Sequence, residues 1–324
     1  AGRGGGGPGA TRIGGYGELH YRALERTKEI DFHRAVLFVG HDFDERIRLY
    51  TEWDLEHADT GEQGGLELEQ AFLAFRLAPG QELRAGAVLV PLGIINESHE
   101  PPVFYGVERP PVATAIIPST WREGGVQLRG ELGPRWRYDL ALTSGLATDP
   151  AGPDAFVVRK ARQAVSEARA EDLAYTARLR WLPAPGLELG LGAFHQQDIT
   201  QNQGAAVPAT LWAAHGVWRA GPWALKAVYA AWRLDGSAAR ALGRDEQWGA
   251  YLEPSWRVRE DLGLYARYSA WDGQAGDAAD SERRQSELGL SWWPHPRVVV
   301  KGNYQWQEGP GHEDGLSLGV GYDF

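Results

Sequence analysis

The feature that most constrains this chain is an alternation of apolar and polar residues with a period of two. The alternation begins at Ile13 and recurs, with interruptions, to Phe324. This is the side-chain period of a β-strand, whereas an α-helix repeats about every 3.6 residues. Each alternating segment has about ten residues, the length that a tilted strand needs to cross a bilayer. We predict sixteen strands, at 13–24, 31–41, 45–57, 66–78, 82–90, 121–132, 134–145, 171–182, 186–197, 208–219, 222–234, 245–257, 260–271, 283–293, 297–307 and 315–324.

The links between these segments alternate in length. Short turns, most of which contain Gly or Pro, follow the even-numbered segments. After the odd-numbered segments the links are usually longer and polar, and the longest are 91–120 and 146–170. Outer-membrane barrels have short periplasmic turns and longer outside loops. The pattern therefore predicts an all-β fold, a closed antiparallel transmembrane β-barrel over 13–324, preceded by a flexible Gly-rich leader at 1–12.

Composition favours a barrel over a bundle of transmembrane helices. Hydrophobic residues make up 43% of the chain, but the mean hydropathy is −0.40. No apolar run approaches the roughly 20 residues that a transmembrane helix requires. The chain has no Cys, which excludes thiol catalysis and Cys-ligated metals, and its net charge of −10 argues against nucleic acid as a partner.

Tryptophans are placed near the predicted strand ends, which predicts an aromatic belt at each membrane interface. The set near the short turns is Trp136, Trp181, Trp218, Trp223, Trp256, Trp292 and Trp293. The set toward the opposite ends is Trp53, Trp121, Trp232, Trp248 and Trp271.

Charged residues on the strands must face the lumen, because a charge facing lipid at mid-membrane costs about 2–4 kcal/mol. Strand parity then predicts a basic wall formed by Arg84, Arg129, Arg135, Arg137, Arg178 and Arg180. The segments 31–41, 66–78 and 186–197 do not alternate cleanly. Such mixed phase indicates a β-bulge or burial against another protomer.

The last segment places Leu316, Leu318, Val320, Tyr322 and Phe324 on one parity, and it resembles the closing strand of bacterial outer-membrane proteins. Sixteen strands, a long third outside loop and the final Phe resemble the trimeric porins of Gram-negative outer membranes. The stretch Arg84–Gly93, a loop rich in Glu and Pro, and Gly124-Gly125-Val126 are similar to the phosphate-selective porin O and P group. The resemblance implies an outer-membrane location, contact with lipid and lipopolysaccharide, a homotrimer, and passive diffusion of ions and small polar solutes.

The resemblance also implies that the third loop, Pro91–Thr120, folds into the barrel as a constriction. Its charged and polar candidates are Glu97, His99, Glu100, Glu108 and Arg109. Phosphate-selective relatives line this constriction with Lys and Arg, whereas this loop has no Lys and one Arg. We therefore expect acidic loop residues to oppose the basic wall and to give mild ion selectivity. A substrate-selective channel for anions of the phosphate type is the alternative.

Other functions have weaker support in the sequence. There is no Gly-x-Ser-x-Gly, His-Glu-x-x-His, Walker or Rossmann motif, so an outer-membrane barrel enzyme is less favoured. A soluble β-rich binding protein would need polar residues where the strands carry Leu, Val and Trp. No cofactor is expected. Two candidate metal sites are Glu97, His99 and Glu100 for a cation, and Asp272, Asp277, Asp280 and Glu282 for loop-bound Ca²⁺. The helix-like stretch 156–169 is expected to cap the barrel, with a partial plug as the alternative.

Overall fold

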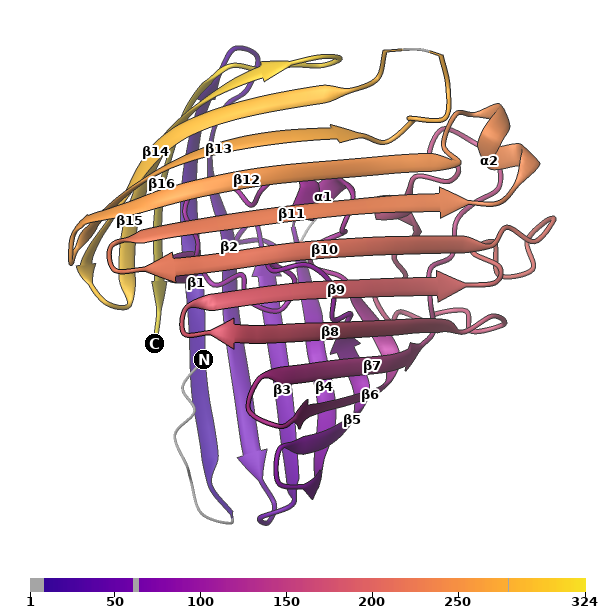
Figure 1. Ribbon diagram of the computed structural model, residues 1–324, viewed down its shortest axis with the longest axis horizontal. Coiled ribbons are helices and arrows are strands. Elements are labelled where there is room, and N and C mark those ends of the chain that lie inside the picture. The colour runs from indigo at the N-terminus through magenta and orange to yellow at the C-terminus, as the bar shows by residue number, and fades with distance from the viewer. Residues whose placement is uncertain (1–8, 61–63, 279) are drawn as a thin grey trace.

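The chain forms a closed barrel of sixteen antiparallel strands in a computed structural model that describes residues 9–60, 64–278 and 280–324 (Figure 1). The strands are β1 (Thr11–Leu24), β2 (Lys28–Asp42), β3 (Ile47–Glu56), β4 (Gly65–Ala78), β5 (Gln81–Leu89), β6 (Arg122–Leu132), β7 (Trp136–Thr143), β8 (Ala174–Ala184), β9 (Leu187–Gln196), β10 (Ala209–Ala220), β11 (Trp223–Leu234), β12 (Glu246–Arg259), β13 (Leu262–Asp272), β14 (Arg283–His295), β15 (Val298–Glu308) and β16 (Gly315–Asp323). The predicted strands are confirmed, with small shifts at their ends. Within the described ranges, no helix is long and apolar enough to cross a membrane.

Pairing of β1 with β16 closes the barrel. The Phe324 amide donates to the Gly15 carbonyl at 2.9 Å, and the Gly15 amide donates back at 3.3 Å. Residues 1–8 of the predicted leader lie outside the described residues, and its last two residues, Thr11 and Arg12, belong to β1. β1 thus begins two residues before the predicted end of the leader, and Arg12 pairs with Asp42 at 2.7 Å.

Side chains alternate between the two faces of the wall. On β16, the apolar set from Leu316 to Tyr322 is exposed on the outer face, whereas Ser317 on the opposite parity is buried. Two predicted irregularities are confirmed as bulges. The pairing of β1 with β2 shifts between Glu18 and His20, and that of β3 with β4 shifts beside Glu52, so that Glu69 is the extra residue.

The predicted difference between turns and loops holds with one exception. The link from β1 to β2 spans only residues 25–27, although it follows an odd-numbered strand. The longest links follow β5 and β7, as predicted, and contain the short elements η1 (Pro101–Val103), α1 (Val112–Ala115) and η2 (Val158–Ala161). A further short helix, α2 (Ser237–Ala241), follows β11.

The aromatic belt is confirmed near the short turns except at Trp293, and it is largely wrong at the other end. Trp136 stacks on Trp181 and Trp223 stacks on Trp256, with ring centroids 5.6 and 5.2 Å apart, and all four are exposed. Four tryptophans assigned to the belts are instead buried: Trp121, Trp232, Trp271 and Trp293. Parity explains the difference, because proximity to a strand end does not decide which face a side chain occupies.

The buried tryptophans Trp121, Trp232 and Trp271 belong to a large apolar cluster. It joins the link after β5, the link after β7 and inner-face residues of β8 to β13, including Phe194. The predicted helix over 156–169 is wrong: only η2 forms there, and residues such as Ala164 and Val165 have positive φ, which interrupts a helix. Phe156, Val158 and Ala161 are buried in the apolar cluster, although the backbone that carries them is irregular.

Candidate functional site

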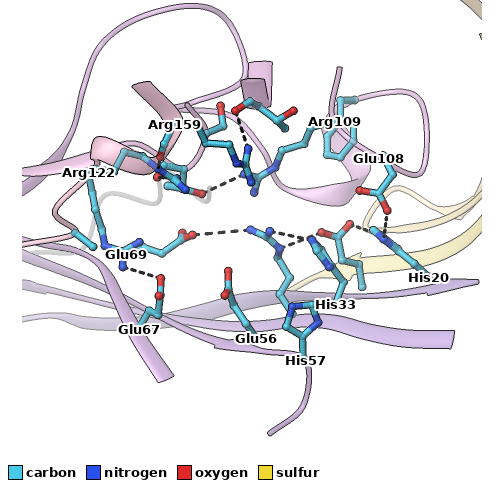
Figure 2. Close-up of a pocket in the computed structure, with 18 of the residues that line it drawn as sticks. His20, His33, Glu56, His57, Glu67, Glu69, Glu108, Arg109, Arg122 and Arg159 are labelled. Atoms are coloured by element: carbon cyan, nitrogen blue, oxygen red, sulfur yellow. Dashed lines mark hydrogen bonds and ion pairs between the residues drawn. The ribbon is translucent and has the colours of Figure 1, made fainter. Parts of the chain in front are cut away.

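Two charged cavities lie on the inner side of β1 to β8. The outer cavity, of about 440 Å³, lies near the strand ends that carry the longer links, and both signs of charge line it (Figure 2). The inner cavity, of about 480 Å³, lies near the short turns. Its charged lining residues are Arg48, Arg76, Glu82, Arg84, Arg129, Glu131, Arg137 and Arg180.

The link between β5 and β6, residues 90–121, contacts inner-face residues around much of the wall; we call it the third-loop segment. Val107 donates its amide to Asn303 on β15 at 3.0 Å, and Trp232 on β11 donates its indole N–H to the Ile116 carbonyl at 2.8 Å. η1 contacts β1, β15 and β16, and α1 contacts β12 and β13. The segment is therefore fixed at several points of the circumference.

The carboxamide of Asn96 clamps the two ends of this segment together. Its Nδ2 donates to the carbonyls of Val90 and Trp121 at 2.8 and 3.0 Å, and its Oδ1 accepts from the Trp121 amide at 2.7 Å. The side chain is buried. The position requires a carboxamide, because the Nδ2 donor and the Oδ1 acceptor of Asn96 are both used.

Asn96→Asp is expected to lower the free energy of unfolding by about 2–4 kcal/mol, since a carboxylate cannot donate to the two carbonyls and buried polar groups lose their partners. Denaturant unfolding of the detergent-folded protein measures the change. Asn202→Asp, in an exposed link, is the matched control and should change stability by less than about 0.5 kcal/mol. Equal changes in the two variants would contradict the clamp.

Glu97 ties the third-loop segment to β6 and β8. It accepts from the Arg178 guanidinium and lies 3.3 Å from Arg129, while both arginines also contact Asp139 on β7. Burial alone would raise the pKa of Glu97, but the charges of Arg178 and Arg129 outweigh it and lower the pKa to about 2. A carboxylate whose pKa is lowered in the folded state stabilises the fold at pH values above its ordinary pKa. This contribution is lost only as the pH falls toward 2, so Glu97 keeps its contacts with the arginines in mild acid.

Glu108 ties the same segment to β1. His20 Nδ1 lies 3.0 Å from Glu108 and His20 Nε2 lies 3.1 Å from Glu18, so only the doubly protonated imidazolium can donate both hydrogen bonds. Arg267 on β13 donates to the Glu108 carbonyl at 3.3 Å. Arg109 donates to Thr120 at 3.1 Å, within the segment.

The structure brings most of the predicted basic wall together. Arg84, Arg129, Arg137 and Arg180 line the inner cavity, and Arg178 lies beside it in the Glu97 network. Arg135 does not belong to this wall. It occupies the exposed turn before β7, because the strand begins at Trp136 rather than at residue 134.

Neither predicted metal candidate forms as proposed. Glu97 is engaged by arginines, whereas His99 lies 3.3 Å from Glu69 and groups with Glu69 and Glu52 instead of Glu97 and Glu100. In the acidic loop, Asp272 accepts from Gln274 and Ser281, and Glu282 pairs with Arg284. Among the described residues, no three carboxylates of that loop come close enough to share an ion.

Several cavity residues escaped prediction. Arg48 and Arg76 line the inner cavity from β3 and β4. Parity could have included Arg48, whereas Arg76 lies in the segment 66–78, which does not alternate cleanly. Arg122, Arg159 and Arg162 line the outer cavity. Arg159 and Arg162 reach it from the irregular link after β7 and donate to the carbonyls of Thr114 and Thr120. Alternation along a strand cannot predict where residues of an irregular link lie.

Residues 14–314 match the family described as phosphate-selective porin O and P. A protein of Aquifex aeolicus (strain VF5) described as uncharacterized is 30% identical over 329 aligned positions, which cover 90% of this chain and 74% of that protein.

Solved outer-membrane structures share the fold at low identity. A Salmonella typhi OmpF complex with daunomycin has a TM-score of 0.71 at 13% identity, covering 98% of both chains. The outer membrane channel DcaP of Acinetobacter baumannii has a TM-score of 0.69 at 12% identity, again over 98% of both chains. OmpT of Vibrio cholerae in its trimer form has a TM-score of 0.68 at 12% identity, covering 98% of this chain and 100% of that one.

Proposed function

Because the chain belongs to the phosphate-selective porin O and P family and is an outer-membrane channel, we propose that its third-loop segment narrows a water-filled lumen. Ions and small polar solutes diffuse through this lumen. The single observation that supports the constriction is the position of Glu97, which reaches across to Arg129 and Arg178 where the arginine-lined inner cavity begins.

The apolar cluster displaces the path toward one side of the barrel. It buries inner-face residues of β8 to β13, whereas both charged cavities lie along β1 to β8. A solute that enters the outer cavity meets both signs of charge, and one that reaches the inner cavity meets six arginines and two glutamates. Charges of one sign in a confined space concentrate the opposite ion.

The channel is therefore proposed to prefer anions mildly. Ion pairs of Arg84 with Glu82 and of Arg137 with Glu131 reduce the excess positive charge without cancelling it. A substrate-selective anion channel of the phosphate type is the second candidate, and the same arginine cluster favours it. Competition between phosphate and chloride for the current distinguishes the two.

Replacing Arg76, Arg137 and Arg180 together with alanine is expected to lower the anion-to-cation permeability ratio by about threefold or more, because half of the arginines of the inner cavity are removed. Reversal potentials in a salt gradient at low ionic strength measure this ratio, since salt screens the charges. Arg135→Ala removes an arginine of the exposed turn and should leave the ratio nearly unchanged. An unchanged ratio in the folded triple variant would contradict anion preference at this cavity.

A homotrimer is also proposed, since the similar OmpT structure is described as a trimer form. Light scattering in detergent, corrected for the micelle, should give three chains per particle. A monomer would contradict this assembly without affecting the channel. We also propose that the chain is not an enzyme, because a channel family accounts for the barrel and its charged lumen.

A further inference from the structure

Three histidines gather at the wall of the outer cavity: His20, His33 and His57 (Figure 2). Asp31 lies among them, with its Oδ2 3.1 Å from His33 Nδ1 and 2.9 Å from His57 Nδ1. We propose that Asp31, His33 and His57 form a binding site for a divalent transition-metal ion such as Zn²⁺; we call it the histidine site.

The backbone places these side chains together by two local irregularities. A bulge in β2 lies between Asp31 and Arg34, so that Asp31, His33 and Arg34 all have side-chain contacts on the inner side. His57 follows the end of β3 with a φ of 55°, in the left-handed region. Bulges and strained residues of this kind often re-aim side chains at functional positions.

The separations between the ligand atoms suit a metal ion. Bonds of about 2.0–2.1 Å to nitrogen and oxygen place adjacent ligands roughly 2.9–3.4 Å apart, depending on whether the geometry is octahedral or tetrahedral. The separations of 2.9 and 3.1 Å from Asp31 fall within that range, and all three ligand atoms lie within 4.8 Å of one another. Two imidazoles and one carboxylate are the ligands that zinc and its neighbours accept, and harder ions such as Ca²⁺ prefer oxygen alone.

The site is open to ions from the outer cavity. The side chains of Asp31, His33 and His57 are 21%, 28% and 40% exposed, so three protein ligands leave coordination positions for water. The group of Glu52, Glu69 and His99 differs from this site because it is buried. Its His99 already contacts Glu69 and so holds the third-loop segment to β4.

Neighbouring side chains contact the ring of His33 and restrict its position. The His20 ring stacks on His33 with centroids 4.8 Å apart, and Glu18 and Glu108 fix its two nitrogens. A metal on His33 Nδ1 leaves the proton on Nε2, so the 3.2 Å contact of Arg34 with Nε2 has to open. Arg34 keeps its contact with Glu18 at 3.1 Å, which allows this adjustment.

Metal binding to the untagged full chain, folded in detergent, tests the proposal. Calorimetric titration with Zn²⁺ should show one saturable ion per chain, and Co²⁺ should give visible ligand-field absorption that Zn²⁺ displaces. His57→Gln and Asp31→Asn should each weaken Zn²⁺ binding by at least about tenfold. His312→Gln, at an exposed histidine of another link, is the matched control and should bind like the unmodified chain.

Each contrary result overturns the assignment. Absence of saturable Zn²⁺ binding by the unmodified chain would do so, as would undiminished binding in both His57→Gln and Asp31→Asn. Equal weakening in His312→Gln would show that the ion binds elsewhere. Heat-dependent migration on a detergent gel verifies that every variant is folded, and His57 lies in an exposed link where glutamine does not disturb the wall.

Discussion

Arg267→Met should lower the free energy of unfolding by about 3–5 kcal/mol, because it leaves two buried carboxylates without their shared cation. Arg267 contacts Glu287 at 2.6 Å and Glu253 at 3.1 Å, and all three residues are at most 3% exposed. Methionine retains much of the length of the side chain but not its charge or its five donors. Denaturant unfolding in detergent measures the loss.

The matched control for Arg267 is Arg259→Met. Arg259 pairs with Asp261 at 3.0 Å in an exposed turn, and its side chain is 62% exposed. Exposed pairs contribute about 0–1 kcal/mol, so this variant should be nearly as stable as the unmodified chain. A loss of the same size in both variants would contradict the view that the charged inner wall depends on buried networks.

Trp121→Ala should have a comparable effect on stability and also increase conductance. Trp121 is fully buried where the third-loop segment meets the link after β7, and it packs against Phe194 and Trp232 with ring centroids 5.0 and 6.0 Å away. Truncation of a buried tryptophan costs about 3–5 kcal/mol. The substitution leaves a void where the third-loop segment packs against the link after β7, so both links should become more mobile. The path should then widen, and single-channel currents should become larger and noisier.

Trp212→Ala is the control for Trp121. Trp212 lies on the outer face of β10 and is 64% exposed, so its loss should leave conductance unchanged. Single-channel recordings of both variants at the same salt concentration make the comparison. A stable Trp121→Ala channel with unaltered conductance would show that the apolar cluster does not limit the path.

Repeated local signals made the barrel predictable from the sequence. Alternation and the difference between turns and loops report on each strand separately, so an error of a few residues at one end, as at Trp136, does not alter the count. The mixed phase of 31–41 and 66–78 also had a local cause, since each segment carries a bulge.

The interior of the barrel was less predictable, because contacts between distant segments decide it. The sequence predicted that Glu97 faces a basic wall, but not which arginine of that wall it contacts, since Arg178 is 81 positions away. Trp121 was assigned to a membrane belt because its position at a strand end could not reveal the apolar cluster that the two long links form. The histidine site was missed for the same reason: β2 supplies Asp31 and His33, whereas His57 comes from the end of another strand.

Charge-selective modification of a single introduced cysteine tests most directly whether ions pass beside the third-loop segment. The chain has no Cys, so Thr114→Cys, at the outer cavity, would carry the only thiol. We predict that attaching a bulky charged thiol reagent reduces the single-channel conductance, and that positive and negative reagents shift the reversal potential in opposite directions. Leu191→Cys, on the exposed outer face, should show neither change. Full conductance and an unshifted reversal potential after complete modification of Thr114→Cys would contradict the proposed path.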